Sequence, residues 1–256
     1  MSTPDELFAL VESYLGELAL TPELGGQAES VRYSIEVGGK RVRPVICLAT
    51  AEAGAGDAET ALPAAAAIEL VHTFSLVHDD LPALDDDEER RGHPSTWKQY
   101  GEAVGILAGD ALLAEAFRLA LSYPTPAVAR ELAQATLGMI GGQYLDITAT
   151  APDLASLHRL KTGCLFAASV GLGLWAAEVP AREQPPWRAF GDELGLLFQV
   201  VDDILDEDGY VLERGADGAR VLADEAAERA QAQLDEIPAD TSVLSEIVAG
   251  LAARTS

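Results

Sequence analysis

The sequence is poor in lysine and cysteine and has no long unbroken apolar run. Only three of its seventeen basic residues are lysines, and its two cysteines are Cys47 and Cys164. Two cysteines in apolar settings do not form a disulfide framework, so we expect buried free thiols in a reducing compartment. The longest apolar run, Cys164 to Ala177, is fourteen residues long with two glycines. Because a membrane-spanning helix needs about 20 apolar residues, this run predicts a core helix.

Positive charge is scarce at the N-terminus and overall. The first residues, MSTPDELFAL, have no basic start followed by an apolar core, so they do not resemble a signal peptide. With 42 acidic residues against 17 basic ones, the net charge is −25 at pH 7. Such a chain repels nucleic acid and anionic membrane surfaces. We therefore expect a soluble, cytoplasmic protein with no nucleic-acid partner and no membrane insertion.

Sustained period-two alternation is also missing, which argues against an extensive sheet. Helix signals are frequent: Thr3 to Glu6 form a capping box, and Gly38-Gly39 form a C-terminal cap. We predict an all-α protein, a bundle of about ten helices around a deep central cavity, with residues 1–256 as a single domain. The expected helices are approximately 4–18, 22–37, 40–53, 59–80, 102–121, 126–149, 154–177, 187–207, 216–236 and 242–253.

Carboxylates are abundant at the end of one of these helices. Seven of the eleven residues from Asp79 to Glu89 are acidic. A helix C-terminus is already negative, so this cluster repels itself unless a divalent cation with oxygen ligands binds there. Carboxylates that keep some water suit Mg²⁺. The alternative is a solvated acidic loop in an acidic protein.

A second acidic group lies far along the chain. Asp202 and Asp206 are four residues apart, and Gln199 lies one turn earlier, so a helix places them near one another. The residues around them are apolar, which indicates a buried helix whose carboxylates need a partner. Two aspartate-rich helix ends over an apolar interior indicate one metal cluster bound from both sides.

Basic residues are concentrated at the start of a helix. The sequence Lys40-Arg41-Val42-Arg43-Pro44 places cations where free N–H groups already attract anions. A bound anion would satisfy both the side chains and the helix end. The alternative is that Arg41 and Arg43 pair with surface acids. Two of the three lysines, Lys40 and Lys161, occupy motif positions.

Five motifs in fixed order resemble the trans-isoprenyl diphosphate synthase (polyprenyl synthetase) family, of the bacterial farnesyl or geranylgeranyl type. They are GGKRVRP at 38–44, HTFSLVHDDLPALDDDEERRG at 72–92, LAGDALL at 107–113, KTG at 161–163 and FQVVDDILD at 198–206. The resemblance implies the isoprenoid synthase fold, a homodimer and a cofactor of three Mg²⁺ ions. It also implies a short-chain prenyltransferase that condenses isopentenyl diphosphate with dimethylallyl or geranyl diphosphate.

The resemblance further implies residues that bind the two diphosphates. Its metal ligands, which would bind the allylic diphosphate through Mg²⁺, are Asp79, Asp85 and Asp202. Its cations for the allylic diphosphate are Arg90 and Lys161. Its residues for isopentenyl diphosphate are Lys40, Arg43, His72 and Arg91.

The remaining implied roles concern the carbocation and the product. Dipoles near Lys161 and Thr162 and the amide of Gln199 would stabilise the allylic cation, and the departed diphosphate would take the proton. Phe74 and Ser75, five and four positions before Asp79, would set the chain length. The aromatic ring implies farnesyl diphosphate, with geranylgeranyl diphosphate as the alternative product. Phe74 could instead be a plain core aromatic.

The chain departs from the family after the second acidic motif. Where relatives carry a glycine- and lysine-rich loop, Asp208 to Ala219 reads DGYVLERGADGA. We therefore expect a shortened C-terminal lid at about 208–219. This favours one alternative, a non-catalytic regulatory subunit with the same fold. A terpene cyclase is the other alternative, and the DDILD sequence opposes it. His93, His158 and Trp175 are expected to be structural.

Overall fold

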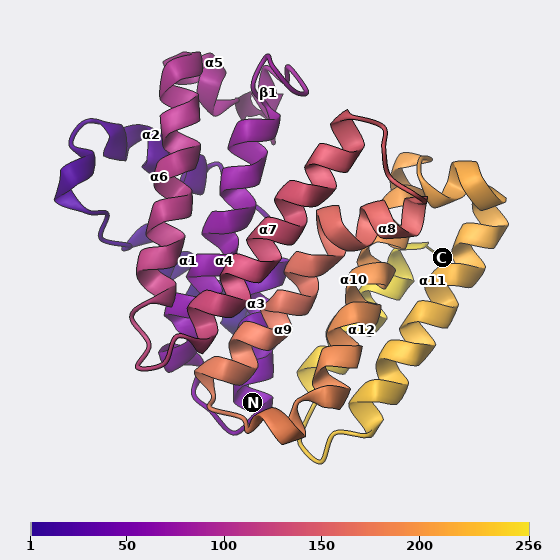
Figure 1. Ribbon diagram of the computed structural model, residues 1–256. Helices are drawn as coiled ribbons and strands as arrows, with labels where there is room; N and C mark the ends of the chain where they lie inside the picture. Colours follow the sequence, from indigo (N-terminus) through magenta and orange to yellow (C-terminus); the bar gives the residue numbers. More distant parts are fainter. Residues whose placement is uncertain (1, 256) are drawn as a thin grey trace.

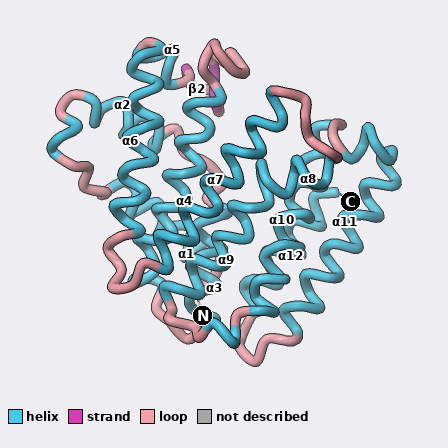
Figure 2. Tube along the Cα trace, viewed as in Figure 1, coloured by secondary structure: helices cyan, strands magenta, loops and turns pink. Residues whose placement is uncertain are grey.

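The computed structural model describes residues 2–255, and its regular structure is helical apart from one small hairpin (Figures 1 and 2). This confirms the prediction of an all-α bundle. The strands of the hairpin are β1 (Glu89–Arg90) and β2 (His93–Pro94). The α-helices are α1 (Pro4–Gly16), α2 (Gln27–Glu36), α3 (Val42–Ala53), α4 (Ala58–Asp79), α5 (Thr96–Tyr100), α6 (Glu102–Ala120), α7 (Ala127–Ile147), α8 (Leu154–His158), α9 (Cys164–Ala176), α10 (Pro185–Asp206), α11 (Tyr210–Asp235) and α12 (Ser242–Ala252).

Helix α4 is the centre of the bundle, with α1, α3, α6 and α9 packed around it. Its run of small residues, including Ala64, Ala65 and Ala67, is fully buried, which lets neighbouring helices approach closely. By length and composition α4 is also apolar enough to cross a membrane, yet 67% of its most apolar 18-residue window is buried inside the fold. Burial of this kind is what a core helix shows.

A proline inside α4 is accommodated by a tyrosine hydroxyl. Pro63 has no N–H and cannot continue the normal hydrogen-bond ladder. Tyr123 Oη donates to the Thr60 carbonyl at 2.8 Å and accepts from Ala64 N at 3.2 Å. The hydroxyl therefore satisfies backbone groups next to the proline, and the helix continues to Asp79.

One end of the bundle collects the functional motifs. The C-terminal ends of α4, α7 and α10 and the N-terminal end of α9 point toward the top in Figure 1, where the hairpin also lies. The hairpin turns at Arg91 (φ 56°) and Gly92 (φ 79°), the two positive φ angles that a tight two-residue turn requires. This turn brings the chain back after the acidic segment. The sequence did not predict the hairpin or the single-turn helix α5.

The expected helix over 154–177 is interrupted by a π-helical turn, Arg159–Gly163. Two glycines on neighbouring helices allow this turn to come close. A Cβ on Gly142 of α7 would lie 2.4 Å from Lys161 N, and one on Gly195 of α10 would lie 3.0 Å from Gly163 Cα. The π turn thus packs directly against the backbones of α7 and α10. Such π turns are common at functional sites.

Two other segments differ from the expected helices. The region expected as 22–37 is a short 3₁₀ turn, Pro22–Leu24, followed by α2, because the chain bends at Gly25 (φ 50°). After the second acidic motif, α11 already begins at Tyr210, with a break at Gly215 (φ 76°, ψ 161°). Much of the segment 208–219 is therefore helical, and its role as a shortened lid stays a prediction.

Candidate active site

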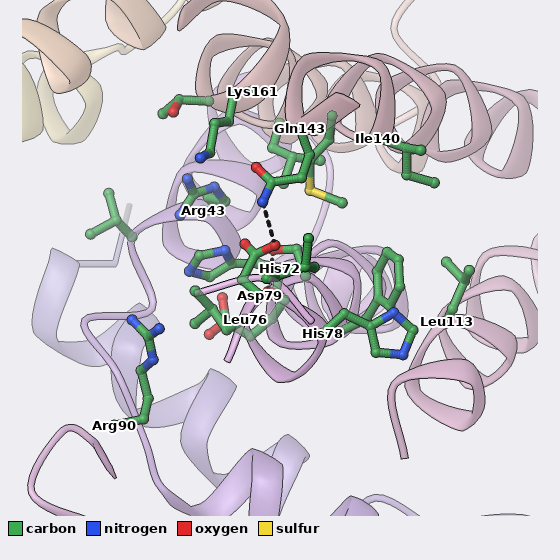
Figure 3. A pocket seen from close by; sticks show the side chains of 18 of the residues that line it. Arg43, His72, Leu76, His78, Asp79, Arg90, Leu113, Ile140, Gln143 and Lys161 are labelled. Carbon is green, nitrogen blue, oxygen red and sulfur yellow. Dashed lines mark hydrogen bonds between the residues drawn. The ribbon is translucent and has the colours of Figure 1, made fainter. Parts of the chain in front are cut away.

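A cavity of about 970 Å³ opens among the ends of α4, α7 and α10, the start of α3 and the π turn (Figure 3). Most of the residues singled out from the sequence line it. These are Lys40, Arg43, His72, Phe74, Ser75, Asp79, Arg90, Arg91, Lys161, Thr162 and Asp202. The fold thus brings together motifs that are far apart in the sequence. Asp85 and Gln199 are not among the lining residues.

Asp79 is held at the end of α4 by a neighbour on α7. Gln143 Nε2 donates to Asp79 Oδ1 at 2.9 Å (Figure 3). The pKa of Asp79 is raised to about 6, mainly by burial; the nearby Lys161 acts to lower it, whereas Asp85 and Asp80 act to raise it. Asp85 itself is exposed, and its backbone N–H donates to the Asp79 carbonyl at 2.9 Å. Asp79 is therefore a carboxylate whose charge is incompletely neutralised by the protein.

The adjacent aspartate has a different partner. Asp80 is 3% exposed, and Arg90 Nε donates to its Oδ1 at 2.9 Å. This bond is the largest influence that raises the pKa of Arg90. Arg90 also lines the cavity, so its guanidinium faces the predicted diphosphate site from a position fixed by Asp80.

Asp202 faces the same cavity from α10. Burial raises its pKa, and Asp206 adds to the rise, while Lys40 and Arg43 lower it. Asp206 is exposed at the helix end. Asp202 and Asp79 are thus two partly desolvated carboxylates in one cavity.

The two arginines of the basic motif have separate surroundings. Arg41 is 3% exposed and pairs with Glu12 at 2.5 Å and Glu69 at 2.8 Å. The alternative of pairing with acids therefore applies to Arg41, although the pair with Glu69 is buried and only Glu12 is at the surface. Arg43 Cζ instead lies 4.4 Å from the centroid of the Phe166 ring. Burial lowers the pKa of Arg43 to about 10.

Arg43 is a half-buried cation that lines the open cavity. Its Nε atom is buried without a hydrogen-bond partner in the described part of the chain. Its guanidinium also lies 5.8 Å from the Phe198 ring centroid, so two aromatic rings make cation–π contacts with it. A cation with unused donors in such a place is suited to bind an anion.

His72 and Arg91 complete the cationic wall. Burial lowers the pKa of His72 well below its usual range, and Arg43 and Arg91 lower it further, so its imidazole is neutral at pH 7. Arg91 packs its guanidinium against Gly39, where a Cβ would lie 2.6 Å from Arg91 Nη1. Gly39 therefore makes room for this arginine.

Two polar residues on α7, Gln143 and Asp146, contact predicted site residues although the sequence motifs did not indicate them. Lys161 Nζ contacts Asp146 Oδ2 at 2.5 Å, and Gln143 holds Asp79. Gln143 and Asp146 are three residues apart on one face of a mostly apolar helix, directly after Gly141-Gly142. This spacing of two polar residues on an apolar helix could have indicated that they face the site.

Gln199, predicted to stabilise a carbocation, is directed elsewhere. Its Nε2 donates to Asp203 Oδ1 at 2.7 Å. Residues four apart on a helix are neighbours, so Asp203 competes for the amide with Asp202. The structure does not bring Gln199 to the cavity.

The cavity becomes apolar beyond the carboxylates. Phe74 is 7% exposed and lines it, with its ring edge-to-face against His78 at a centroid distance of 5.0 Å. Leu113, Met139 and Ile140 line the same region. Ser75 Oγ donates to the His72 carbonyl at 2.8 Å. A charged mouth over an apolar interior fits a ligand with a charged head and a hydrocarbon tail.

The carboxylates of the cavity fit a hard divalent cation whose remaining ligands are water and substrate oxygens. Among residues 2–255, no group of three His, Cys, Asp or Glu side chains is close enough to bind a metal by itself. Asp79 and Asp202 offer carboxylate oxygens with raised pKa values. Mg²⁺ typically uses one or two carboxylates and completes its shell with water and phosphate oxygens.

The all-α fold, with two acidic helix ends over one cavity, was compared with known protein families. The polyprenyl synthetase family model matches residues 27–217. The chain belongs to the polyprenyl synthetase family, which confirms the resemblance seen in its motifs.

Relatives and solved structures agree with this assignment. The chain is 42% identical to a geranylgeranyl diphosphate synthase of Cyanophora paradoxa over 70% of its length and 64% of that protein. It is 40% identical to a farnesyl diphosphate synthase of Bacillus subtilis over 71% of its length and 66% of that protein. The matches thus span less than two thirds of each of these two relatives.

Solved structures match over nearly the whole chain. A geranyltransferase from Legionella pneumophila superposes with a TM-score of 0.86 at 30% identity, covering 98% of this chain and 96% of that one. An FPP/GFPP synthase from Zymomonas mobilis gives 0.83 at 31% identity, covering 96% and 98%.

Proposed function

We propose that this protein is a short-chain prenyltransferase that condenses isopentenyl diphosphate with an allylic diphosphate and forms farnesyl diphosphate. The observation that carries the proposal is one cavity lined by Asp79, Asp202 and Arg43, whose Nε atom has no hydrogen-bond partner among the described residues. The names of the relatives support the same reaction class. They include geranylgeranyl diphosphate synthases, which keeps that product as the alternative.

The allylic diphosphate binds at the acidic side of the cavity. Asp79, Asp85 and Asp202 hold Mg²⁺, for which we propose three ions, and Arg90 and Lys161 add positive charge. Bound Mg²⁺ supplies Lewis-acid stabilisation of the leaving diphosphate. Asp80 holds Arg90 in place, and Asp146 does the same for Lys161.

Isopentenyl diphosphate binds at the cationic wall, formed by Lys40, Arg43, His72 and Arg91. The neutral imidazole of His72 can donate a hydrogen bond without adding charge. The backbone and side-chain dipoles at Lys161 and Thr162 face the reacting carbons. Apolar side chains deeper in the cavity exclude water that would quench the cation. The departed diphosphate accepts the proton after the new bond forms.

Phe74 is proposed to limit the product length. Its ring lies on the apolar side of the cavity, one turn from Asp79. We expect Phe74→Ala to shift products from fifteen carbons toward twenty or more, because each additional buried CH₂ gains about 0.8 kcal/mol. Chromatography of extracted products measures the shift. Phe74→Leu removes less volume and should shift them less.

The control for this variant is Phe8→Ala, because Phe8 is 37% exposed on α1, outside the cavity. It should leave the product distribution as in the wild type. Unchanged products in Phe74→Ala would assign the length limit to another residue. A wild type that makes mainly the twenty-carbon product would favour the geranylgeranyl alternative.

We also propose a cytoplasmic homodimer. Helices α6 and α7 expose large apolar side chains outside the cavity, including Ile106 (46%), Leu107 (55%) and Leu137 (65%). Exposed apolar surface of this kind favours association. Sedimentation equilibrium at micromolar concentration tests the proposal, and a monomeric mass would reject it.

The reaction itself is tested by incubating the protein with Mg²⁺, isopentenyl diphosphate and each allylic diphosphate in turn. We expect the substrates to be consumed and a fifteen-carbon diphosphate to form. Calorimetry with the same diphosphates is the companion measurement. Binding without turnover would favour the regulatory subunit over the enzyme.

A further inference from the structure

Asp203, next to the proposed metal ligand Asp202, is turned away from the cavity into a polar cluster behind it. Asp203 is 6% exposed and is not a lining residue. Its Oδ1 accepts from Gln199 Nε2 at 2.7 Å, and its Oδ2 accepts from the backbone N of Tyr210 at 2.8 Å. Its carbonyl accepts from Asp208 N at 3.0 Å. This one residue therefore ties α10 to the start of α11.

The turn after α10 is shaped around this carboxylate. A Cβ on Gly209 would lie 2.1 Å from Asp203 Oδ2, and the glycine has a positive φ of 47°. No larger residue fits there while the carboxylate keeps its place. Tyr210 follows at 2% exposure, and Gly215 breaks the helix one turn later. The first turn of α11 is thereby attached to α10.

The cluster also reaches the π turn through His158, the last residue of α8. The His158 ring lies edge-to-face against Tyr210 at a centroid distance of 5.2 Å, with Nδ1 3.6 Å from Asp203 Oδ2. That buried Nδ1 has no hydrogen-bond partner among the described residues. His158 is joined directly to Arg159–Gly163, which carries Lys161 and Thr162 to the cavity.

On its other sides the π turn contacts α7 and α10 closely, and Lys161 pairs with Asp146 of α7. Gly142 of α7 and Gly195 of α10 allow close approach there. The His158, Asp203 and Tyr210 cluster adds a side-chain contact at the N-terminal end of the turn. A shift of this cluster would move Lys161 relative to Asp202.

We propose that Asp203 is a positioning residue that holds the π turn and the first turn of α11 in register with Asp202, and is not itself a metal ligand. Both carboxylate oxygens already accept hydrogen bonds from protein donors, and the side chain is buried away from the cavity. The inference rests on the proposed function for the roles of Asp202, Lys161 and Thr162.

Hydrogen exchange measured by mass spectrometry tests the positioning role. In Asp203→Asn the Tyr210 N–H loses a charged acceptor, so we expect about tenfold faster exchange in peptides covering 158–163 and 208–214. Asp202→Asn should leave these peptides unchanged. The control for loss of one negative charge is Asp217→Asn, because the Asp217 side chain is fully exposed.

Metal binding tests the second half of the proposal. Mn²⁺, a spectroscopic substitute for Mg²⁺, can be titrated in the presence of inorganic pyrophosphate and followed by electron paramagnetic resonance. Asp202→Asn should weaken binding, whereas Asp203→Asn should not, although its kcat should fall by about tenfold. Equal weakening in both variants, or unchanged exchange over 158–163 in Asp203→Asn, would overturn the proposal.

A second variant decides the question if Asp203→Asn does not fold. His158→Phe keeps an aromatic ring against Tyr210 and removes the nitrogen that faces Asp203. It should speed exchange in 158–163 and leave 208–214 unchanged, and unchanged exchange in both peptides would contradict the coupling. Exchange and Mn²⁺ binding require no turnover, so an inactive wild type would reject the proposed function while these measurements still decide the role of Asp203.

Discussion

Replacing Asp79 or Asp202 by alanine is expected to lower kcat by about 10²-fold or more, the scale of losing one element of a preorganised charge site. The two carboxylates line one cavity from α4 and α10. Burial raises both pKa values, which means that the folded protein alone does not neutralise them well. Each variant removes a repulsive, partly desolvated charge, so the fold should survive.

Steady-state kinetics at saturating Mg²⁺ measures this effect, and circular dichroism verifies folding. Asp224→Ala is the control, because it removes the same group from an exposed position on α11, outside the predicted lid at 208–219. A variant of Asp79 or Asp202 that turns over the allylic substrate at the wild-type rate would show that the two acidic motifs do not form one site.

Replacing Arg43 by methionine is expected to reduce kcat/KM for isopentenyl diphosphate by about 10²-fold without lowering thermal stability. The half-buried guanidinium stacks on Phe166, and its buried Nε atom has no partner in the described structure. A partly desolvated cation with an unpaired donor destabilises the free protein, whereas a bound diphosphate would satisfy it. In Arg43→Met, kcat/KM should therefore fall while the melting temperature does not.

Arg43→Lys separates charge from geometry. Lysine keeps the charge but loses the planar group that stacks on Phe166 and binds two oxygens at once, so activity should remain well below wild type. Arg182→Met, at an exposed site with 82% side-chain exposure, is the control. A large loss of melting temperature in Arg43→Met would indicate a structural role for this arginine instead.

Local sequence patterns determined most of the helices and the proposed chemistry. The capping box at Thr3 is formed as predicted, with Glu6 N donating to Thr3 Oγ1 at 3.3 Å. The acidic and basic motifs identified most cavity residues, because charged residues at the ends of apolar helices need partners. Capping and helical period depend on residues within one or two turns, so they can be read from the sequence.

Long-range packing decided what short patterns could not. The π turn at Arg159–Gly163 depends on close approach to Gly142 and Gly195, residues on two other helices. Gln143 and Asp146 became site residues only because α7 lies beside the ends of α4 and the π turn. No local signal specifies such neighbours.

The clearest contrast lies within the paired aspartates. From the sequence, the motif resemblance assigns metal binding to Asp79 and Asp202 and gives no role to Asp80 and Asp203. In the folded protein Asp79 and Asp202 face the cavity, while Asp80 binds Arg90 and Asp203 binds the start of α11. Adjacent residues on a helix point about 100° apart. The sequence motifs therefore determined which member of each pair faces the shared site, and the packing of the other helices decided what the second member binds, because those partners lie on other elements.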